Sequence, residues 1–402
     1  MWNAASVRPF DGPAVGAIEL GVTSELRRAG AMILAAALTL TGLGLVMIYN
    51  TSGVLSQRFG SSTFFLAKQA VWSGAALAVM FVARGVDYHL YVRLRKPILL
   101  AVLALLVAVL IPGLGVKLNG ARRWFRFAGV GFQPSDIAKL GLIVYLAGFL
   151  DQKRDVLGSW KRGFLPLVLV TGCAVGLIAA EPDIGTAALI ACTCGGVLLV
   201  GGVRLRHLVP AVLVTVPVAA GFIVLRFPHV RHRLFSFIDP SADPLGAGYH
   251  ARQSLIALAS GGVFGRGLAG GSQKLFFLPE AHTDFIFSII GEELGLLGAV
   301  FVVGAFAAIL IGVMIIIRHA PDRTGALIAT GVALWLGLQA AFNIAVVTAS
   351  VPTKGIPLPF VSYGGSTLVV TAAAVGIVLN VAGHGMTPPR RGFVGEWTGS
   401  SI

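Results

Sequence analysis

Charged residues are scarce in this chain of 402 residues. Asp, Glu, Lys and Arg make up 12% of the sequence, about half of the roughly 25% that is usual for soluble domains. Hydrophobic residues make up 56%, so too few polar groups remain to cover a water-facing surface. The composition excludes a soluble enzyme, a disordered protein and a collagen, and it indicates a polytopic membrane protein.

Cysteine is nearly absent, with Cys173, Cys192 and Cys194 all lying in apolar stretches. So few cysteines exclude a disulfide scaffold. On a helix, residues two apart point away from each other, so Cys192 and Cys194 do not face one another. We interpret all three as small core residues and not as a metal or redox site.

Apolar runs that approach the length needed to cross a bilayer occur ten times in the sequence. They predict an all-α fold with a ten-helix membrane domain over residues 29–384, between a cytoplasmic N-terminal tail (1–28) and a cytoplasmic C-terminal tail (385–402). The one long connection, 226–284, is expected to be a large extracytoplasmic loop with short interfacial helices. The predicted spans are 29–49, 65–83, 97–112, 134–150, 163–180, 184–201, 207–225, 285–317, 324–349 and 365–384.

The distribution of Lys and Arg predicts the orientation of this bundle. An even number of spans places both termini on one side, and that side carries 17 cations against 12 on the other. The excess predicts cytoplasmic termini. The net charge of +14 is therefore attributed to loops at an anionic membrane surface and not to nucleic-acid binding. The 12 cations on the other side concentrate in residues 113–133 and 226–284. Membrane orientation does not explain them, so they need a second explanation.

Ionisable side chains at membrane depth point to function, and the first such segment carries Arg122, Arg123, Asp136 and Lys139. Asp136 and Lys139 are three residues apart and can pair on one helix face. A helix cap with a lysine reaching toward the membrane surface is the plain interpretation. The alternative is that Arg123 and Lys139 bind an anionic headgroup, which the depth of Lys139 in its apolar run favours.

The second segment is a tight turn between two spans that contains Glu181 and Asp183. Its Pro and Asp residues could simply form the turn and cap the next helix. Two carboxylates at one turn could also orient cationic side chains or hold a divalent cation.

The third segment leads into the eighth span and contains Asp284. On a continuous helix, Asp284, Ser288, Glu292 and two glycines would form one polar and small stripe, which must face protein or a wet cavity because a lipid-facing carboxylate is costly. A packed stripe capped by Asp284 is one interpretation. A carboxylate at the mouth of an apolar cavity is also what a general base needs. The same outer loop carries Arg231, Arg233, Glu280 and His282.

The fourth segment, 352–366, contains Lys354 and Ser362. Three prolines within it prevent a helix, and irregular backbone at membrane level is tolerated where protein buries it or where it lines a wet cavity. A purely structural connection is the alternative. The histidines of the sequence show no metal-ligand spacing, so a histidine metal site is not expected.

These segments closely resemble the SEDS (shape, elongation, division and sporulation) family of bacterial membrane proteins, over about residues 29–384. The runs that carry the resemblance are Gly120–Trp124, Gln133–Lys139, Glu181–Thr186, Leu278–Gly295 and Pro352–Ser366. One departure is Asp136, where the family usually has Glu, so the reach of this carboxylate is shorter.

The resemblance implies a peptidoglycan glycosyltransferase of the bacterial cytoplasmic membrane whose active site faces outward. Its substrate would be lipid II, an undecaprenyl-pyrophosphate disaccharide-pentapeptide. A class B penicillin-binding protein and other divisome or elongasome membrane proteins would be its partners. The family's essential Asp matches Asp284, the expected general base. Metal dependence is left open, with a divalent cation as the one cofactor considered.

The remaining candidate residues fall into two groups. Those expected to bind the substrate are Arg122, Arg123, Lys139, Arg231, Arg233, Lys354 and Ser362. Those expected to support the site are Asp136, Glu181, Asp183, Glu280, His282 and Glu292.

Two other functions stay open at this point. A lipid II flippase needs the same substrate and a cationic cavity, but its polar groups should be accessible from both sides, whereas here they cluster on the predicted outer side. A scaffold that only recruits the transpeptidase has no need of a carboxylate among several cations. Residues 278–284 and 352–355 look more like division members of the family than rod-shape members, so we expect a role in division, with elongation as the alternative.

Overall fold

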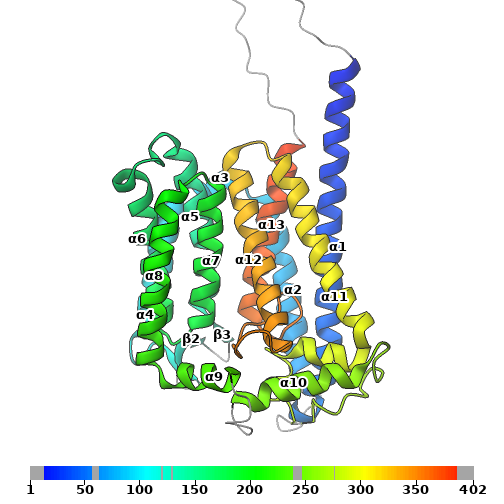
Figure 1. Cartoon of the computed structure of the whole chain (residues 1–402). Helices are drawn as coiled ribbons and strands as arrows, with labels where there is room; N and C mark the ends of the chain where they lie inside the picture. Colours follow the sequence, from blue (N-terminus) through cyan, green and yellow to red (C-terminus); the bar gives the residue numbers. More distant parts are fainter. Residues whose placement is uncertain are drawn as a thin grey trace, which may run out of the picture.

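The structure is a computed structural model that describes residues 13–56, 63–118, 121–127, 130–238, 247–275 and 277–386. Long helices run side by side, and the strands and two of the shorter helices gather at one end of the bundle (Figure 1). The predicted C-terminal tail beyond residue 386 and Gly120 of the first motif lie outside the described residues.

Ten long helices coincide with the ten predicted spans and confirm the all-α class. They are α1 (Pro13–Ser56), α2 (Phe64–Gly85), α4 (Arg95–Leu110), α5 (Pro134–Gln152), α6 (Leu165–Ala180), α7 (Ile184–Val200), α8 (Leu205–Arg226), α11 (Ile286–Arg318), α12 (Arg323–Val347) and α13 (Gly365–Gly385). Within the described part of the chain, 7 helices are long and apolar enough to cross a membrane. The other three, α4, α5 and α7, are shorter or carry more charge, so their spanning stays a prediction.

The first helix is longer than the sequence indicated. It begins at Pro13 instead of at about residue 29, so part of the predicted N-terminal tail is helical. The start of α1 and the end of α13 lie at the same end of the bundle (Figure 1), as an even number of spans requires.

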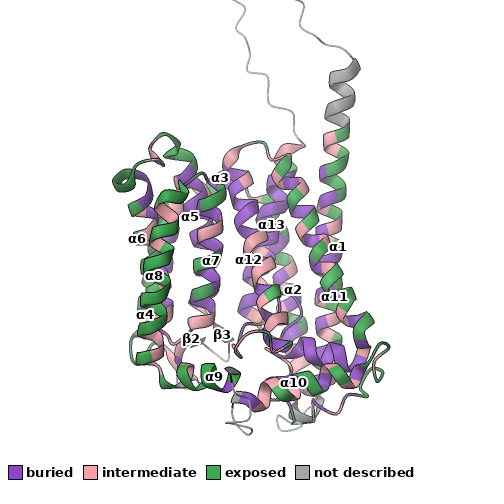
Figure 2. Cartoon of the chain, in the orientation of Figure 1, coloured by how far each residue is buried: buried purple, intermediate pink, exposed green. Residues whose placement is uncertain are grey.

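Helix α13 forms the centre of the bundle, where it packs against α1, α2, α5 and α12. Its small residues allow close approach, which is how helices associate in membranes. A Cβ added at Gly376, for example, would lie 2.3 Å from the Met80 carbonyl oxygen of α2. Helix α8 is the opposite case, because none of its residues is buried (Figure 2).

The cysteines are only partly as expected. Cys194 packs in the core, but Cys173 and Cys192 lie exposed on the bundle surface. Small apolar thiols suit a lipid-facing helix surface as well as a core, so composition alone did not separate the two places.

The loop 113–133 folds into a three-stranded antiparallel sheet, which the sequence analysis did not anticipate. Its strands are β1 (Val116–Leu118), β2 (Ala121–Phe127) and β3 (Val130–Phe132), paired in that order. The long connection 226–284 contains α9 (Pro228–Ile238) and α10 (Ala247–Gly261), which confirms the short helices expected there. A short α3 (Tyr88–Arg93) follows α2 at the opposite end. The sheet, α9 and α10 together define what we call the cavity end of the bundle (Figure 1).

Helix α11 is kinked at Gly295, where φ is +67°. Glycine adopts this conformation without the steric strain that a Cβ would cause. The kink separates a short first segment, which packs on α10, from the long membrane segment.

Candidate active site

A cavity of about 880 Å³ lies at the cavity end, walled by β2, the start of α5, the α6–α7 turn, α9 and the irregular segment 352–363. The structure therefore brings together segments that are far apart in the sequence. Eight predicted site residues line the cavity: Arg123, Asp136, Lys139, Asp183, Arg233, Glu280, Asp284 and Lys354.

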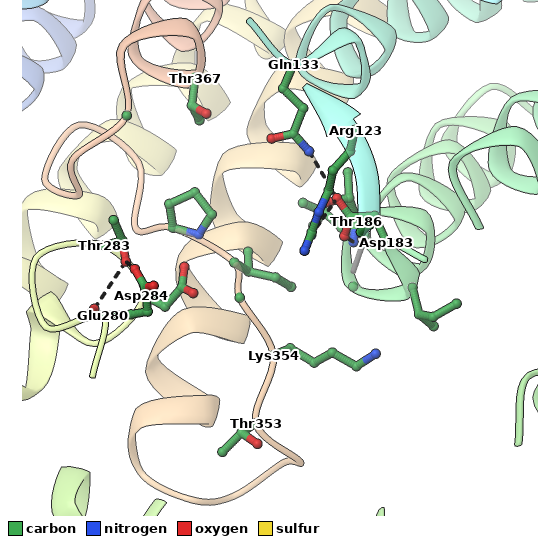
Figure 3. Close-up of a pocket in the computed structure, with 18 of the residues that line it drawn as sticks. Arg123, Gln133, Asp183, Thr186, Glu280, Thr283, Asp284, Thr353, Lys354 and Thr367 are labelled. Carbon is green, nitrogen blue, oxygen red and sulfur yellow. Dashed lines mark hydrogen bonds and ion pairs between the residues drawn. The ribbon is translucent and has the colours of Figure 1, made fainter. Parts of the chain in front are cut away.

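Asp284 lies just before α11 and faces this cavity (Figure 3). Its backbone is fixed from two sides. Asn343 of α12 donates through Nδ2 to the Asp284 carbonyl at 2.8 Å, and the Ser362 hydroxyl donates to the neighbouring Thr283 carbonyl at 2.6 Å. Because Phe285 is the N-cap of α11, the expectation that Asp284 caps this helix is wrong. The carboxylate is left free for chemistry.

Burial and, to a smaller extent, the nearby Glu280 raise the pKa of the Asp284 carboxyl to about 7, against the opposite effect of Arg123 and Arg233. A carboxyl that titrates near neutral pH can both accept and release a proton under working conditions. That property suits a general base.

Besides Lys139, three cations face the same cavity from different elements: Arg123 from β2, Arg233 from α9 and Lys354 from the irregular segment. Arg123 Nη1 lies 3.5 Å from Asp183 Oδ2, which is long for an ion pair. Neither Arg233 nor Lys354 has a carboxylate within ion-pair distance among the described residues. Burial and, to a smaller extent, the nearby Arg233 lower the pKa of Lys354 to about 8. Cations without partners in one cavity form a site for an anion.

Lys139 is paired, as the i, i+3 spacing predicted. Its Nζ lies 2.9 Å from Asp136 Oδ1, and both side chains are buried. Asp136 also accepts hydrogen bonds from the Ser366 and Thr367 hydroxyls at 3.1 and 2.8 Å. Lys139 Nζ lies 5.1 Å from the ring centroid of Trp335. The pair holds α5 to α13, and Asp136 makes no cap on α5.

Asp183 fulfils both roles proposed for the α6–α7 turn. It accepts the Thr186 N–H as the cap of α7, and it accepts from Gln133 Nε2 at 3.0 Å while facing Arg123 (Figure 3). Glu181 is fully buried and does not line the cavity. Burial and the nearby Asp183 raise the pKa of Glu181 to about 8, while Arg123 acts in the opposite direction. Of the two carboxylates only Asp183 lines the cavity, and a divalent-cation site at this turn stays a prediction.

Five further candidates lie outside the cavity lining. Ser362 fixes the backbone beside Asp284, as described above. His282 packs between the rings of Phe65 and Tyr363. Glu292 is buried and accepts the backbone N–H of Ser272 at 2.8 Å, which anchors the connection 226–284 to α11. Arg122 and Arg231 are not among the residues that line the cavity.

The stripe predicted on α11 faces protein, as argued from its polarity. The Ser288 hydroxyl lies 2.7 Å from the Ser254 hydroxyl of α10, and Glu292 is buried under the connection 226–284. Asp284 is not part of this stripe, because α11 begins only at Ile286.

Two amides on α12 are site residues that the sequence analysis did not find. Gln339 donates to the Pro357 carbonyl at 2.8 Å, and Asn343 donates to the carbonyls of Asp284 and Ile356. They are four residues apart on an otherwise apolar span, and this i, i+4 amide pair is the signal that would have identified them.

Gly355 is required beside Asp284, because a Cβ added there would lie 2.7 Å from Asp284 Oδ2. We expect Gly355→Ala to displace the carboxylate and to lower the activity of the site by at least tenfold with little change in stability, since only a side-chain end must move. Gly304→Ala is the matched control, because an added Cβ there meets nothing within 4 Å. Equal activity and equal melting temperatures in both variants would show that the position of this carboxylate is unimportant.

Comparison with known proteins places this geometry in context. The family profile of FtsW, RodA and SpoVE, described as cell cycle proteins, matches residues 30–386. A protein of Geobacter metallireducens named probable peptidoglycan glycosyltransferase FtsW is 40% identical over 89% of this chain and 96% of its own. Stage V sporulation protein E of Bacillus subtilis is 39% identical over 86% of this chain and 94% of its own.

Two solved structures share the fold. A chain from a structure titled as structural coordination of polymerization and crosslinking by a peptidoglycan synthase complex superposes with a TM-score of 0.74 at 30% identity, covering 88% of this chain and 97% of that chain. The rod shape determining protein RodA of Thermus thermophilus superposes with a TM-score of 0.64 at 28% identity, covering 87% and 95% of the two chains.

Proposed function

Because the chain belongs to the FtsW, RodA and SpoVE family, we propose that it is a peptidoglycan glycosyltransferase that polymerises lipid II. The observation that carries the proposal is a carboxyl of near-neutral pKa, Asp284, in one cavity with Arg123, Arg233 and Lys354, of which the last two have no ion-pair partner among the described residues. A sugar polymerisation with a pyrophosphate leaving group needs both.

The reaction assigns a part to each side of the cavity. A sugar hydroxyl of the acceptor attacks the anomeric carbon of the donor, and a new C–O bond forms while the bond to pyrophosphate breaks. The hydroxyl proton passes to the Asp284 carboxylate, because a neutral hydroxyl is a poor nucleophile; such a base contributes about 10²–10⁴-fold. The electron pair of the broken bond leaves with the pyrophosphate.

Arg123, Arg233 and Lys354 are the proposed ligands of the pyrophosphate. Fixed cations aimed at the place where negative charge develops stabilise the transition state without reorganisation. Lys139 is a weaker candidate than its sequence position suggested, because Asp136 already neutralises it. Lys139 and Asp136 instead shape the wall of the cavity.

We propose that both termini lie in the cytoplasm and that the cavity opens on the outer face. The 17 to 12 distribution of cations supports this orientation, and the ligand role of Arg123, Arg233 and Lys354 accounts for the cations on the opposing side. The role in division and the partnership with a class B penicillin-binding protein are likewise proposals. They are supported by relatives named FtsW and by a similar chain in a peptidoglycan synthase complex.

The test is polymerisation by the purified protein. Full-length chain, alone and with its transpeptidase partner, is incubated with fluorescent lipid II, and the products are separated by length. We expect a ladder of glycan strands. Intact lipid II after incubation with the complex, while an unrelated lipid II polymerase extends the same substrate, would contradict the proposal.

We expect a bell-shaped dependence of the polymerisation rate on pH. It should rise as pH increases through about 7, because the Asp284 carboxyl must lose its proton to act as a base, and fall as pH increases through about 8, because Lys354 loses its positive charge. Initial rates across about pH 6 to 9 measure both limbs. Lys354→Arg should remove the upper limb, because arginine stays charged. A rate that is constant across this range would contradict both assignments.

A further inference from the structure

At the end of the bundle opposite the cavity, four elements bring two histidines and two aspartates together. Asp87 lies in the turn between α2 and α3, His89 is on α3, Asp322 precedes α12 and His384 is in the last turn of α13. One ligand atom each from Asp87, His89 and His384 lies within 4.8 Å of the others. These side chains are only partly buried, so solutes reach them.

If both histidines of this cluster are neutral, they have too few N–H groups for the acceptor atoms that surround them. His384 has Nδ1 3.0 Å from the Asn380 carbonyl oxygen, which can only accept, so Nδ1 carries the proton. The lone pair of Nε2 then faces Asp87 Oδ1 at 3.6 Å, so two hydrogen-bond acceptors repel each other. A proton on Nε2 or a bound metal cation between the two atoms would remove this repulsion.

His89 shows the same shortage. Its Nδ1 lies 2.7 Å from Asp87 Oδ1, and its Nε2 lies 2.8 Å from Asp322 Oδ2. A neutral imidazole has one N–H, so it can donate to only one of these two carboxylates. No Lys or Arg forms an ion pair with Asp87 or Asp322 among the described residues.

We propose that Asp87 Oδ1, His89 Nδ1 and His384 Nε2 bind one divalent transition-metal ion of the Zn²⁺ type. Zinc–nitrogen and zinc–oxygen bonds of about 2.0–2.2 Å place tetrahedral ligands roughly 3.3–3.5 Å apart. The 3.6 Å between His384 and Asp87 is close to this separation, while the shorter His89–Asp87 contact opens by a small movement of two half-exposed side chains. The fourth position is open to water.

The outer contacts of both histidines have the form that metal sites use. A ligating histidine usually donates its other N–H to a carboxylate or a backbone carbonyl, which fixes the tautomer. His89 can donate to Asp322, and His384 donates to the Asn380 carbonyl. Asp322 is itself held by the Tyr88 hydroxyl and by the N–H of Gly325.

The donor set selects the metal. Imidazole nitrogen favours Zn²⁺, Co²⁺ or Ni²⁺, whereas Mg²⁺ and Ca²⁺ prefer an all-oxygen shell. Bound metal would tie the α2–α3 turn to the end of α13, the central helix of the bundle. This site is separate from the cavity and independent of the proposed glycosyltransferase activity, because binding is measured without any lipid substrate.

The test is Co²⁺ binding to the full-length protein in detergent, after removal of any polyhistidine tag and of bound metal. We expect one equivalent of Co²⁺ with the visible absorption of a tetrahedral site, displaced by Zn²⁺ but not by Mg²⁺. His384→Ala and His89→Ala should each weaken binding by at least tenfold. Asp322→Asn keeps the α12 cap and should weaken binding by about 10–100-fold through loss of the outer contact.

His319→Ala is the matched control. His319 lies at the same end of the bundle, where it faces Glu25 and the Ile315 carbonyl, outside the cluster. We expect the control to bind Co²⁺ as the unaltered protein does. No saturable Co²⁺ binding by the unaltered protein, or equal affinity in the folded His384→Ala and His89→Ala variants, would overturn the proposal.

Discussion

Asp284→Asn is expected to abolish glycan polymerisation while the protein stays folded. Asparagine has nearly the same size, and Asp284 is held through its backbone carbonyl, which the substitution keeps. The amide cannot accept the hydroxyl proton, so we expect a loss on the order of 10²-fold or more. Lipid II turnover by the purified variant, with its melting temperature measured in the same detergent, tests this.

Two further measurements separate a base from other roles for Asp284. Glu25→Gln removes an exposed carboxylate far from the cavity and should keep the full rate. Titration of divalent cations against the residual activity of Asp284→Asn distinguishes a base from a metal ligand, since excess metal should partly rescue a weakened metal site. Strong rescue would reassign Asp284 to metal binding, and near-normal polymerisation without added metal would remove it from the chemistry altogether.

Lys139→Met is expected to destabilise the protein by about 3–5 kcal/mol, because it leaves the buried Asp136 carboxylate without its cation. Methionine keeps the apolar stem of the side chain, so the effect isolates the charge. The double variant Asp136→Asn and Lys139→Met should recover most of the lost stability, because no unpaired charge remains. Unfolding in detergent as a function of denaturant measures all three proteins.

Arg123→Ala is the informative comparison with Lys139→Met. The Arg123 side chain is 28% exposed and its ion pair with Asp183 is long, at 3.5 Å, so its removal should change stability by only about 0–1 kcal/mol. If Arg123 binds the pyrophosphate, the use of limiting lipid II should nevertheless fall. A Lys139→Met protein as stable as the unaltered protein would show that the buried pair does not stabilise the fold. An Arg123→Ala protein with unchanged activity at limiting substrate would show that Arg123 does not bind the substrate.

The sequence predicted the helices of the bundle well, because the length of an apolar run is set directly by the bilayer. It did not predict the sheet formed by β1, β2 and β3, since its outer strands have three residues each and sheet pairing depends on neighbours that a local pattern does not show. Because of this omission, Arg122 and Arg123 both stand among the expected substrate ligands. Neighbouring side chains on a strand point to opposite faces, and of the two only Arg123 lines the cavity.

The charged part of the site could be predicted because ionisable groups stand out in an apolar sequence. Ion pairs could be predicted only between residues of one helix, as for Asp136 and Lys139. The position of Asp284 was misjudged because the turn over 278–285 delays the start of α11, held by bonds such as the Phe285 N–H to the Glu280 carbonyl. Gln339, Asn343 and Gly355 carry no charge, and their roles depend on contacts between α12 and segments distant in the sequence.

The most direct test of the account follows polymerisation and translocation of lipid II in the same sealed proteoliposomes. Purified protein with its transpeptidase partner is reconstituted with fluorescent lipid II, and the glycan formed and the lipid II moved between leaflets are measured together. The account predicts glycan strands that disappear with Asp284→Asn, and no protein-dependent movement of lipid II. Movement of lipid II between leaflets without any glycan would contradict it and would favour a flippase.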